Sequence, residues 1–451
     1  MKNFHYFKLY LERRMLRIFM LGIISGFPWV LIGSALSLWL KESGLSRSTV
    51  GWAGLIFAVY AFNFLWAPLI DRLRLPYLTK KIGHRKSWIL LMQIIIFIGL
   101  ILWSFLDPVE NLWLIIAVGL GIAISSATQD ITVDALRIEQ IGKNEGRSMA
   151  AGAAMSVVGW WTGYKIGGAV ALISAQFFQT QGVENYWQLS FIILTLIIFL
   201  SCIGLLLIPE KSSDSVILKQ ISNNSLILKK LGKPSLFKKF SASLIGTFVN
   251  PLLSFFKKNS TKVALAIIGF IFLFKIGEAF LGRMSIIFYK EIGFSKTDIA
   301  FYSKGIGWIT TVTFTLVGGF FAIRIGLLKA MFVSGIVMAL TNLMFSVLAW
   351  TGNSEFLFAV AVLLDDLAAA FATVAFVAFI SVLVDRTYTA TQYALLASVG
   401  TAGRTLFASS SGSLVDWLNG DWGIFFIITA LMVIPSLICL FLIRKKLNFN
   451  E

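Results

Sequence analysis

The sequence predicts an all-α integral membrane protein that crosses the bilayer about twelve times, in two similar bundles of six helices. Of its 451 residues, 57% are hydrophobic and only 14% are charged, a balance far from that of an average soluble domain. The apolar residues fall into runs of about twenty, the length that a helix needs to cross a hydrocarbon core. A short motif near the start of the chain also recurs in its second half.

The apolar runs predict twelve membrane spans with these limits: residues 15–40, 48–72, 84–106, 111–136, 147–175, 185–208, 262–289, 296–323, 327–350, 355–384, 388–415 and 422–443. Most of the 39 lysines and arginines fall in the connections on the side of the two termini, which orients both termini toward the cytoplasm. The net charge of +17 is thereby explained without a nucleic-acid partner. Tryptophans near span ends are expected to anchor the helices at the membrane surface: Trp103, Trp113, Trp187 and Trp350.

One long connection divides the chain. Residues 209–261 carry many lysines interleaved with apolar residues such as Leu231 and Phe237. This pattern predicts a cytoplasmic linker with amphipathic helices on the inner leaflet, where anionic lipids attract them; a partner site is the alternative. The expected domains are an N-terminal six-helix bundle at 1–208 and a C-terminal six-helix bundle at 262–451.

The two halves share a motif between their first and second spans. It reads LKESGLS at residues 40–46 and YKEIGFS at residues 289–295. The matches share one offset of 249 residues: Lys41 with Lys290, Glu42 with Glu291, Gly44 with Gly293 and Ser46 with Ser295. Together with the equal number of spans, this favours a duplication. Two parallel six-helix repeats around a midplane cavity describe the major facilitator fold.

The segment ATQDITVDALRIEQ, residues 127–140, places two carboxylates inside the fourth span. Asp130 and Asp134 share one helical face, roughly 10 and 5 Å inside the helix end. Carboxylates at that depth usually face a water-filled path or a protonatable site. We therefore predict that Asp130 and Asp134 carry a coupled proton. The alternative is a structural pair that clamps Arg137 or a neighbouring loop.

Further charges lie deep in the second half. Lys275 and Glu278 begin roughly 18 Å from the inner end of the seventh span, an ion pair that is either structural or broken by a proton or a substrate. We predict a coupling role for Glu278. The expected substrate-binding residues here and in the fifth span are Trp161, Lys165, Lys275, Asp366 and Arg404. The three cations suit an anionic ligand, and the alternative is that these charges neutralise nearby acids on other helices. Trp161 suits stacking on a sugar ring, and the alternative is an apolar packing role.

The connection between the second and third spans resembles the signature loop of major facilitator transporters. Asp71 and Arg72 end the second span, and the cluster GHRK at 83–86 begins the third. In that family such residues hold helices together in the outward-open state, so Asp71, Arg72 and Arg85 are expected to act in gating. Residues 75–82 separate the two parts, and a simple salt bridge at the inner surface is the alternative.

The motifs of several other chemistries are missing from the sequence. There is no Gly-x-x-x-x-Gly-Lys-Ser/Thr phosphate loop, so a gradient is expected to drive transport. His5 and His84 lie outside the deep helices, which argues against a histidine proton relay or metal centre. Hydrolase motifs are also missing, so no catalytic residue, metal or cofactor is expected. A membrane enzyme acting on lipid-linked precursors and a sensor without flux are the alternatives from other classes.

Four stretches carry a closer resemblance: FLWAPLIDR at 64–72, SSATQDITVDA at 125–135, VAFVAFIS at 374–381 and TATQYALLASVGTAGR at 389–404. In these the chain is similar to the AmpG muropeptide permeases, in the branch of the major facilitator superfamily that includes acetyl-CoA transporters. Gln129 and Asp130 become expected cavity residues by this resemblance.

The resemblance implies an importer in the bacterial inner membrane that depends on the proton-motive force, and we expect the protein to be a monomer. Its implied cargo is N-acetylglucosamine linked to anhydro-N-acetylmuramic acid, with or without a stem peptide, recovered for peptidoglycan recycling. The same cargo feeds the signal that induces β-lactamase. Transport of another anionic metabolite, such as a CoA thioester, a peptide or a different sugar, is the alternative within transporters.

Overall fold

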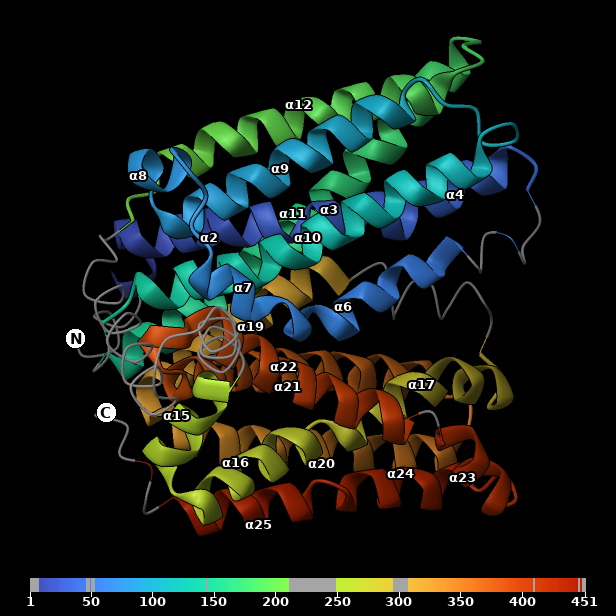
Figure 1. The fold of residues 1–451 in the computed structure, drawn as a ribbon. Coiled ribbons are helices and arrows are strands. Elements are labelled where there is room, and N and C mark those ends of the chain that lie inside the picture. The colour runs from blue at the N-terminus through green and yellow to red at the C-terminus, as the bar shows by residue number, and fades with distance from the viewer. Residues whose placement is uncertain are drawn as a thin grey trace.

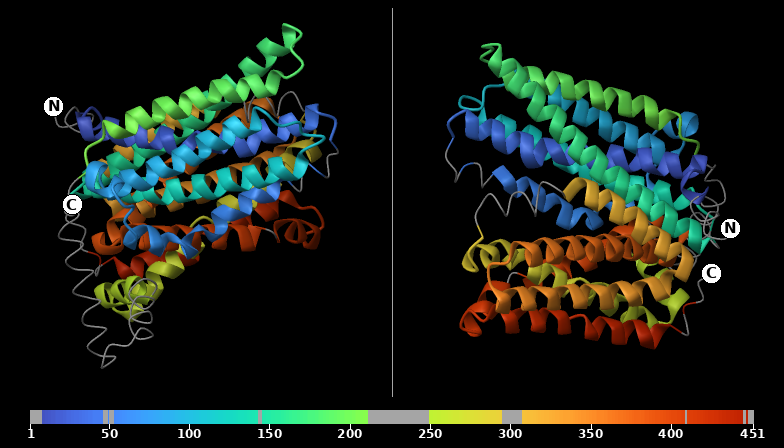
Figure 2. Two further views of the ribbon diagram at one scale, coloured as in Figure 1. Left: turned by 45° about the horizontal axis from the view of Figure 1, so that its top comes forward. Right: turned by 180° about the vertical axis from the view of Figure 1, so that it is seen from behind.

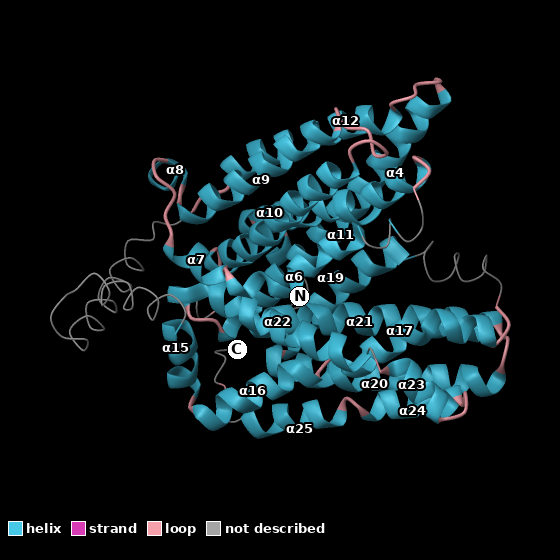
Figure 3. Cartoon of the chain, turned by 45° about the vertical axis from the view of Figure 1, so that its right-hand side comes forward, coloured by secondary structure: helices cyan, strands magenta, loops and turns pink. Residues whose placement is uncertain are grey.

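The computed structural model describes residues 8–45, 49, 53–142, 145–210, 249–294, 307–408, 410–444 and 447. Every regular element in these ranges is helical, and the helices form two bundles that lie side by side (Figure 1). Views from other directions show the same separation of the early helices from the late ones (Figure 2), with short loops at both ends of the bundles (Figure 3). We call the end where α2 begins and α25 ends the basic end, and the opposite end the distal end.

The first bundle is built from these elements: α2 (Arg13–Gly26), α3 (Pro28–Val30), η1 (Leu31–Ala35), α4 (Leu36–Glu42), η2 (Gly54–Ala58), α6 (Val59–Phe62), η3 (Asn63–Leu65), α7 (Ala67–Arg72), α8 (Leu78–Ile82), α9 (His84–Trp103), α10 (Leu112–Glu139), α11 (Gly146–Thr180) and α12 (Tyr186–Leu206). The first span is an irregular rod that runs from α2 to α4. Pro28 cannot donate a helical hydrogen bond, and the π-turn η1 follows directly after α3.

The second bundle follows the linker, with these elements: α15 (Asn250–Asn259), α16 (Thr261–Leu273), α17 (Ile276–Glu291), α19 (Gly307–Ile325), α20 (Leu327–Thr351), α21 (Glu355–Leu383), η6 (Arg386–Tyr388), α22 (Thr389–Ala408), α23 (Ser411–Trp417), α24 (Trp422–Leu431) and α25 (Ile434–Ile443). Its first span is also interrupted, at Phe274 and Lys275 between α16 and α17.

Each of the twelve expected spans overlaps helical residues, and eight helical stretches of the described chain are long and apolar enough to cross a membrane. The second expected span is not among these eight, because its helix is broken into the short pieces from η2 to α7. In the eighth, the described helix begins only at Gly307. The fifth and eleventh spans form the long helices α11 and α22, whose glycines and polar residues dilute their hydropathy.

Glycines bring α2 and α11 into backbone contact. A Cβ atom at Gly26 would lie 2.1 Å from the carbonyl oxygen of Trp160, and one at Gly163 would lie 2.4 Å from that of Ile23. Gly22 and Gly159 make equally close approaches one turn earlier on each helix. Small residues at a spacing of four let two membrane helices approach in this way. The contact fixes the position of Trp160.

The repeated motif ends two helices in the same manner. Gly44 and Gly293 have φ angles of +87° and +100°, a region that glycine adopts without strain. The next residue in each case donates its N–H to a carbonyl five residues earlier, from Leu45 to Leu40 and from Phe294 to Tyr289. Ser46 and Ser295 lie outside the described residues.

The motif glutamates bind equivalent tryptophans. Glu42 Oε2 accepts a hydrogen bond of 2.7 Å from the indole Nε1 of Trp187, at the start of the last span of the first bundle. Glu291 Oε2 accepts one of the same length from Trp422, at the start of the last span of the second bundle. The repeat therefore extends from the sequence into the contacts that join the first and last spans at the distal end of each bundle.

The expectation of surface tryptophans holds for Trp113 and Trp350, which are exposed, but is wrong for Trp103 and Trp187. These two are buried, and each indole N–H has a hydrogen-bond partner on a neighbouring helix or at its end. Trp103 donates to the carbonyl of Ile115 at 3.1 Å, and Trp187 donates to Glu42.

Of the expected linker, residues 209–210 and 249–261 fall within the described residues, and 211–248 lie outside them. Its helix α15 is amphipathic and contacts the second bundle at the basic end. Gln392 Nε2 donates to the carbonyl of Pro251 at 2.8 Å, and Lys258 Nζ donates to that of Leu383 at 3.1 Å. These bonds tie α15 to both ends of the α21–α22 connection.

Candidate functional site

Asp71 and Arg85 form a buried ion pair at the basic end of the first bundle. Arg85 Nη2 lies 2.6 Å from Asp71 Oδ1 and 2.9 Å from Glu139 Oε1, so the arginine joins α7 to α10. Glu210 accepts the backbone N–H groups of Arg85 and Lys86 at 2.8 and 2.9 Å. Burial raises the pKa of the Glu210 carboxyl. The GHRK cluster thus begins α9, as the sequence predicts, and its arginine is held by α7, by α10 and by Glu210, which follows α12.

The same aspartate reaches the second bundle. Asp71 accepts the backbone N–H of Ala390 at 3.1 Å and that of Thr391 at 2.8 Å, and the Thr391 hydroxyl donates at 2.6 Å. These N–H groups belong to the first turn of α22, where an α-helix has donors without helical partners and a partial positive charge. Asp71 therefore acts as an N-cap for a helix of the other bundle. Arg72, the next residue, is partly exposed at the end of α7.

A cation from the second bundle makes the reciprocal contact. Arg386 in η6 donates from Nη1 to the carbonyl oxygen of Ile138 and from Nη2 to that of Ile141 at 2.9 Å. These carbonyls end α10, where a helix has free acceptors and a partial negative charge. Each bundle thus contributes a charge to the end of a helix in the other. We call these two contacts the reciprocal clamp.

Asp134 lies beside the reciprocal clamp and forms an ion pair with Arg137. This pair is the structural alternative that the sequence offered to proton coupling. Arg137 is fully buried and donates to Asp134 Oδ1 from Nε at 3.1 Å and from Nη2 at 3.0 Å. Nη2 also donates to the Ser381 hydroxyl of α21 at 3.0 Å, and the guanidinium lies 5.5 Å from the ring centroid of Tyr393. Asp134 therefore orients an arginine that joins the bundles, and a proton-coupling role for it stays a prediction.

Asp130 has hydroxyl and indole partners. The Ser25 hydroxyl donates to Oδ1 at 2.6 Å, and the indole Nε1 of Trp29 donates to Oδ2 at 3.3 Å. Both donors come from the irregular first span, on either side of Pro28. Among the ion pairs of the described chain, none includes Asp130. Its two neutral donors distinguish it from Asp134, whose donor is an arginine.

Trp29 belongs to an aromatic cluster. Its ring centroid lies 4.5 Å from Tyr60, 5.1 Å from Phe57 and 5.5 Å from Trp160. Trp160 in turn stacks on Tyr164 and meets Trp161 edge-on. Lys165 Nζ lies 5.8 Å from the ring centroid of Trp161. We call this set the aromatic cluster: Trp29, Phe57, Tyr60, Trp160, Trp161 and Tyr164. The predicted residues Trp161 and Lys165 lie at its edge, and Trp29 connects it to Asp130.

The second bundle holds the other group of deep charges. Lys275 Nζ is buried and lies 2.9 Å from Glu278 Oε2 and 2.8 Å from the Thr373 hydroxyl. Asp365 of α21 interacts electrostatically with both members of the ion pair. The break between α16 and α17 places Lys275 in a turn. The predicted pair therefore exists, at an interruption of the helix and beside a second carboxylate.

The two groups occupy corresponding places in the repeat. The offset of 249 residues that relates Lys41 to Lys290 also relates Trp29 to Glu278. Each residue follows an interruption in the first span of its bundle. Each also belongs to a group with a hydrogen bond to a long helix. Trp29 donates to Asp130 of α10, and Lys275 donates to Thr373 of α21.

The remaining predicted residues have these positions. Gln129 is buried and donates to the carbonyl of Ile24 at 2.7 Å, which joins α10 to α2. Asp366 accepts from the Thr310 hydroxyl at 3.5 Å. Arg404 is exposed, lies 3.4 Å from the Thr401 hydroxyl and interacts electrostatically with Lys275. Arg404 therefore belongs with the charges of the second bundle.

Sequence reasoning missed several partners in these contacts: Ser25, Trp29, Thr373, Ser381, Arg386 and Thr391. A usable signal existed only for Ser25 and Trp29, which flank a proline inside an apolar run. The others are common residue types at helix ends or on helix faces, and their partners are distant in the sequence.

The sequence profile of the Major Facilitator Superfamily matches residues 18–306. A protein of Rickettsia conorii described as putative transporter AmpG 4 is 32% identical over 98% of this chain and 99% of its own length. The anhydromuropeptide permease of Escherichia coli K12 is 28% identical over 99% of this chain and 83% of its own length.

Solved structures show the same fold. The proton:xylose symporter XylE superposes with a TM-score of 0.62 at 15% identity, over 96% of this chain and 94% of its own. The human organic anion transporter MFSD10 superposes with a TM-score of 0.58 at 15% identity, over 95% and 99%. The expected fold and the expected transporter class are confirmed. The chain belongs to the AmpG-type permeases of the major facilitator superfamily and is a multi-span membrane transporter rather than an enzyme.

Proposed function

We propose that this permease imports anhydromuropeptides from the periplasm to the cytoplasm by proton symport. The observation that carries the proposal is the contact of Asp130 with Trp29, because it joins a carboxylate to an aromatic cluster. Aromatic faces suit sugar rings, which carry apolar C–H surfaces, and a carboxylate without a cationic partner suits reversible protonation. The E. coli relative described as an anhydromuropeptide permease supports this choice of cargo.

In the proposed mechanism the bundles rock about a cavity between them. The reciprocal clamp closes the basic end in the present conformation, so the site is loaded from the distal end. Lys165, Lys275 and Arg404 attract the anionic groups of the cargo, and the aromatic cluster packs against its sugar rings. A proton taken up by Asp130 or Glu278 neutralises a charge that would otherwise resist enclosure in a site without water. The occluded state then forms, the clamp opens, and the cargo leaves into the cytoplasm.

The test is uptake of labelled GlcNAc-anhydroMurNAc into proteoliposomes with an imposed pH gradient. We expect accumulation that a protonophore abolishes, and competition by anhydromuropeptides but not by CoA thioesters. Asp130→Asn is expected to bind cargo and exchange it down a gradient but not to accumulate it. Wild-type accumulation by Asp130→Asn would remove this carboxylate from the coupling step. Accumulation that survives collapse of the gradient would refute symport.

A further inference from the structure

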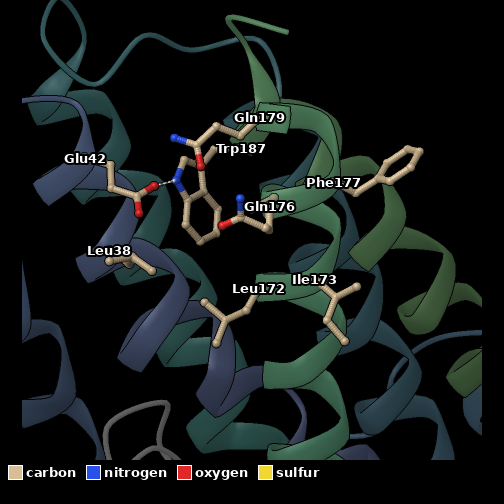
Figure 4. A pocket seen from close by; sticks show the side chains of 9 residues that line it. Leu38, Glu42, Leu172, Ile173, Gln176, Phe177, Gln179 and Trp187 are labelled. Carbon is tan, nitrogen blue, oxygen red and sulfur yellow. Dashed lines mark hydrogen bonds between the residues drawn. The ribbon is translucent and has the colours of Figure 1, made fainter. Parts of the chain in front are cut away.

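A groove opens at the distal end of the first bundle, away from the aromatic cluster and the reciprocal clamp. It has a volume of about 500 Å³ and is formed by the end of α4, the last turns of α11 and the start of α12 (Figure 4). Nothing in the proposed transport cycle uses this groove. Its lining changes from apolar side chains at one end to polar side chains at the other, and this change in polarity indicates the kind of ligand that fits.

The lower wall of the groove is apolar. Leu172 and Ile173 of α11 are 47% and 69% exposed, and Phe177, which is also exposed, lies higher, near the level of Trp187 (Figure 4). They lie within a helix of a membrane-spanning bundle, so the surroundings that such side chains favour are lipid chains rather than water. At about 1.5 Å of rise per residue, the distance from Leu172 to Gln179 is roughly 10 Å, which is comparable with the interfacial layer of one leaflet.

The upper wall is polar and carries one negative charge. Glu42 lies at the C-terminus of α4, where the helix dipole disfavours an anion. The hydroxyl of Tyr186 and the indole of Trp187 both donate to its Oε2, at 3.0 and 2.7 Å. Among the described residues, no hydrogen bond to Oε1 accompanies these two. Gln176 and Gln179 line the same part of the groove around Trp187, and their amides offer hydrogen-bond donors (Figure 4).

We propose that the groove binds one phospholipid whose headgroup ends in a primary ammonium, an ethanolamine phospholipid of the leaflet at the distal end. The ammonium donates to Glu42, the glutamine amides donate to the phosphate, and an acyl chain follows Leu172 and Ile173. Charge complementarity selects this occupant. A choline headgroup has no N–H to donate, and a glycerol headgroup leaves a net anion beside Glu42 in a groove whose described lining residues include no cation.

The second bundle provides a matched control. Glu291 makes the same 2.7 Å bond to a tryptophan as Glu42 does, at the corresponding end of its helix. Glu42→Gln and Glu291→Gln therefore each remove one carboxylate charge and keep an amide oxygen that can accept the indole N–H. Only the first change affects the groove. A loss of stability from the helix contact itself would appear in both variants.

The experiment is native mass spectrometry of the full-length protein released from nanodiscs that contain equal amounts of phosphatidylethanolamine, phosphatidylcholine and phosphatidylglycerol. We expect the wild type to retain ethanolamine lipid with about tenfold preference, the size of effect that one charge-assisted hydrogen bond provides. Glu42→Gln is expected to lose that preference while Glu291→Gln keeps it.

A second variant tests the groove without changing its charge. Gln176→Leu is expected to lower retention of ethanolamine lipid several-fold. It removes an amide that donates a hydrogen bond to the lipid phosphate, and it leaves Glu42 in place. Equal retention of the three lipids by the wild type would overturn the proposal, since it indicates general contact with lipid. Equal effects of Glu42→Gln and Glu291→Gln would also overturn it, because the groove would then not be the origin of the preference.

Discussion

Asp71 of the first bundle caps α22 of the second, accepting both the backbone N–H and the hydroxyl of Thr391 at 2.8 and 2.6 Å. The two residues are 320 positions apart in the chain. Because Asp71 is also paired with Arg85, one carboxylate links the inside of its own bundle to the contact between bundles. The contact between the bundles at the basic end therefore includes a buried carboxylate with partners in both of them.

Asp71→Asn is expected to open the basic end. An asparagine keeps one acceptor but loses the charge, and it leaves Arg85 buried with a weaker partner, a change that costs several kcal/mol when a buried pair is broken. Spin labels on α7 and α22 are expected to show a longer distance between them. Thr391→Val is the milder comparison, since it removes one hydrogen bond worth about 1 kcal/mol and keeps the backbone donors. Unchanged distances in Asp71→Asn would mean that the clamp does not hold the bundles together.

The pair of Lys275 and Glu278 is expected to behave as a unit. Glu278→Gln leaves a buried ammonium with reduced compensation, and Lys275→Met leaves carboxylates beside one another, so each single change is destabilising. The double variant is expected to be more stable than the sum of the single changes predicts, by about 0.5–3 kcal/mol. Thermal unfolding of all four proteins in detergent measures this coupling. Strict additivity would show that the two side chains do not compensate each other.

Gly26→Ala is expected to disturb the aromatic cluster from a distance. Its Cβ would lie 2.1 Å from the carbonyl oxygen of Trp160, so α2 and α11 must separate and carry Trp29 away from Trp160. We expect a lower unfolding temperature and weaker binding of cargo. Gly168→Ala is the matched control on α11, because its Cβ would meet nothing within 4 Å and alanine favours a helix by about 1 kcal/mol. Equal behaviour of the two variants would contradict the packing argument.

The ion pair of Glu145 with Arg14 is expected to make the stability of the fold sensitive to acid. The Glu145 carboxylate lies 2.5 Å from Arg14 Nη1 at the basic end. Burial acts to raise its pKa, but the hydrogen bonds from Arg14 and Ser148 outweigh burial and hold the pKa below its usual value. A carboxyl with a lowered pKa in the folded state stabilises the fold above its ordinary pKa of about 4.3, and this contribution is lost as the pH falls below that value.

Glu145→Gln is therefore expected to lower stability at neutral pH and to flatten the decline of the unfolding temperature below about pH 4.3. The measurement is thermal unfolding in detergent from neutral to acidic pH. Parallel pH profiles for the variant and the wild type would exclude a contribution from this pair.

The sequence by itself determined the helical elements, the depth of the charges and the repeat. These depend on local features: the length of apolar runs, the placement of Asp130 and Asp134 on one face, and the recurrence of Glu42 and Gly44 at Glu291 and Gly293. Helical hydrogen bonds join residues four apart, so a short stretch of sequence contains the information that places them.

The tertiary structure decided which distant partners the charges receive, beyond the local pairs of Asp134 with Arg137 and of Lys275 with Glu278. Two aspartates four residues apart on one helix have different partners, because α2 brings Ser25 and Trp29 to Asp130 while Arg137 occupies Asp134. Arg137 is a local partner, three residues from Asp134 on the same helix, whereas the donors to Asp130 are 105 and 101 residues away in the chain. Partners are set by how the helices pack, and packing depends on the fit of whole helix surfaces that are far apart in the chain.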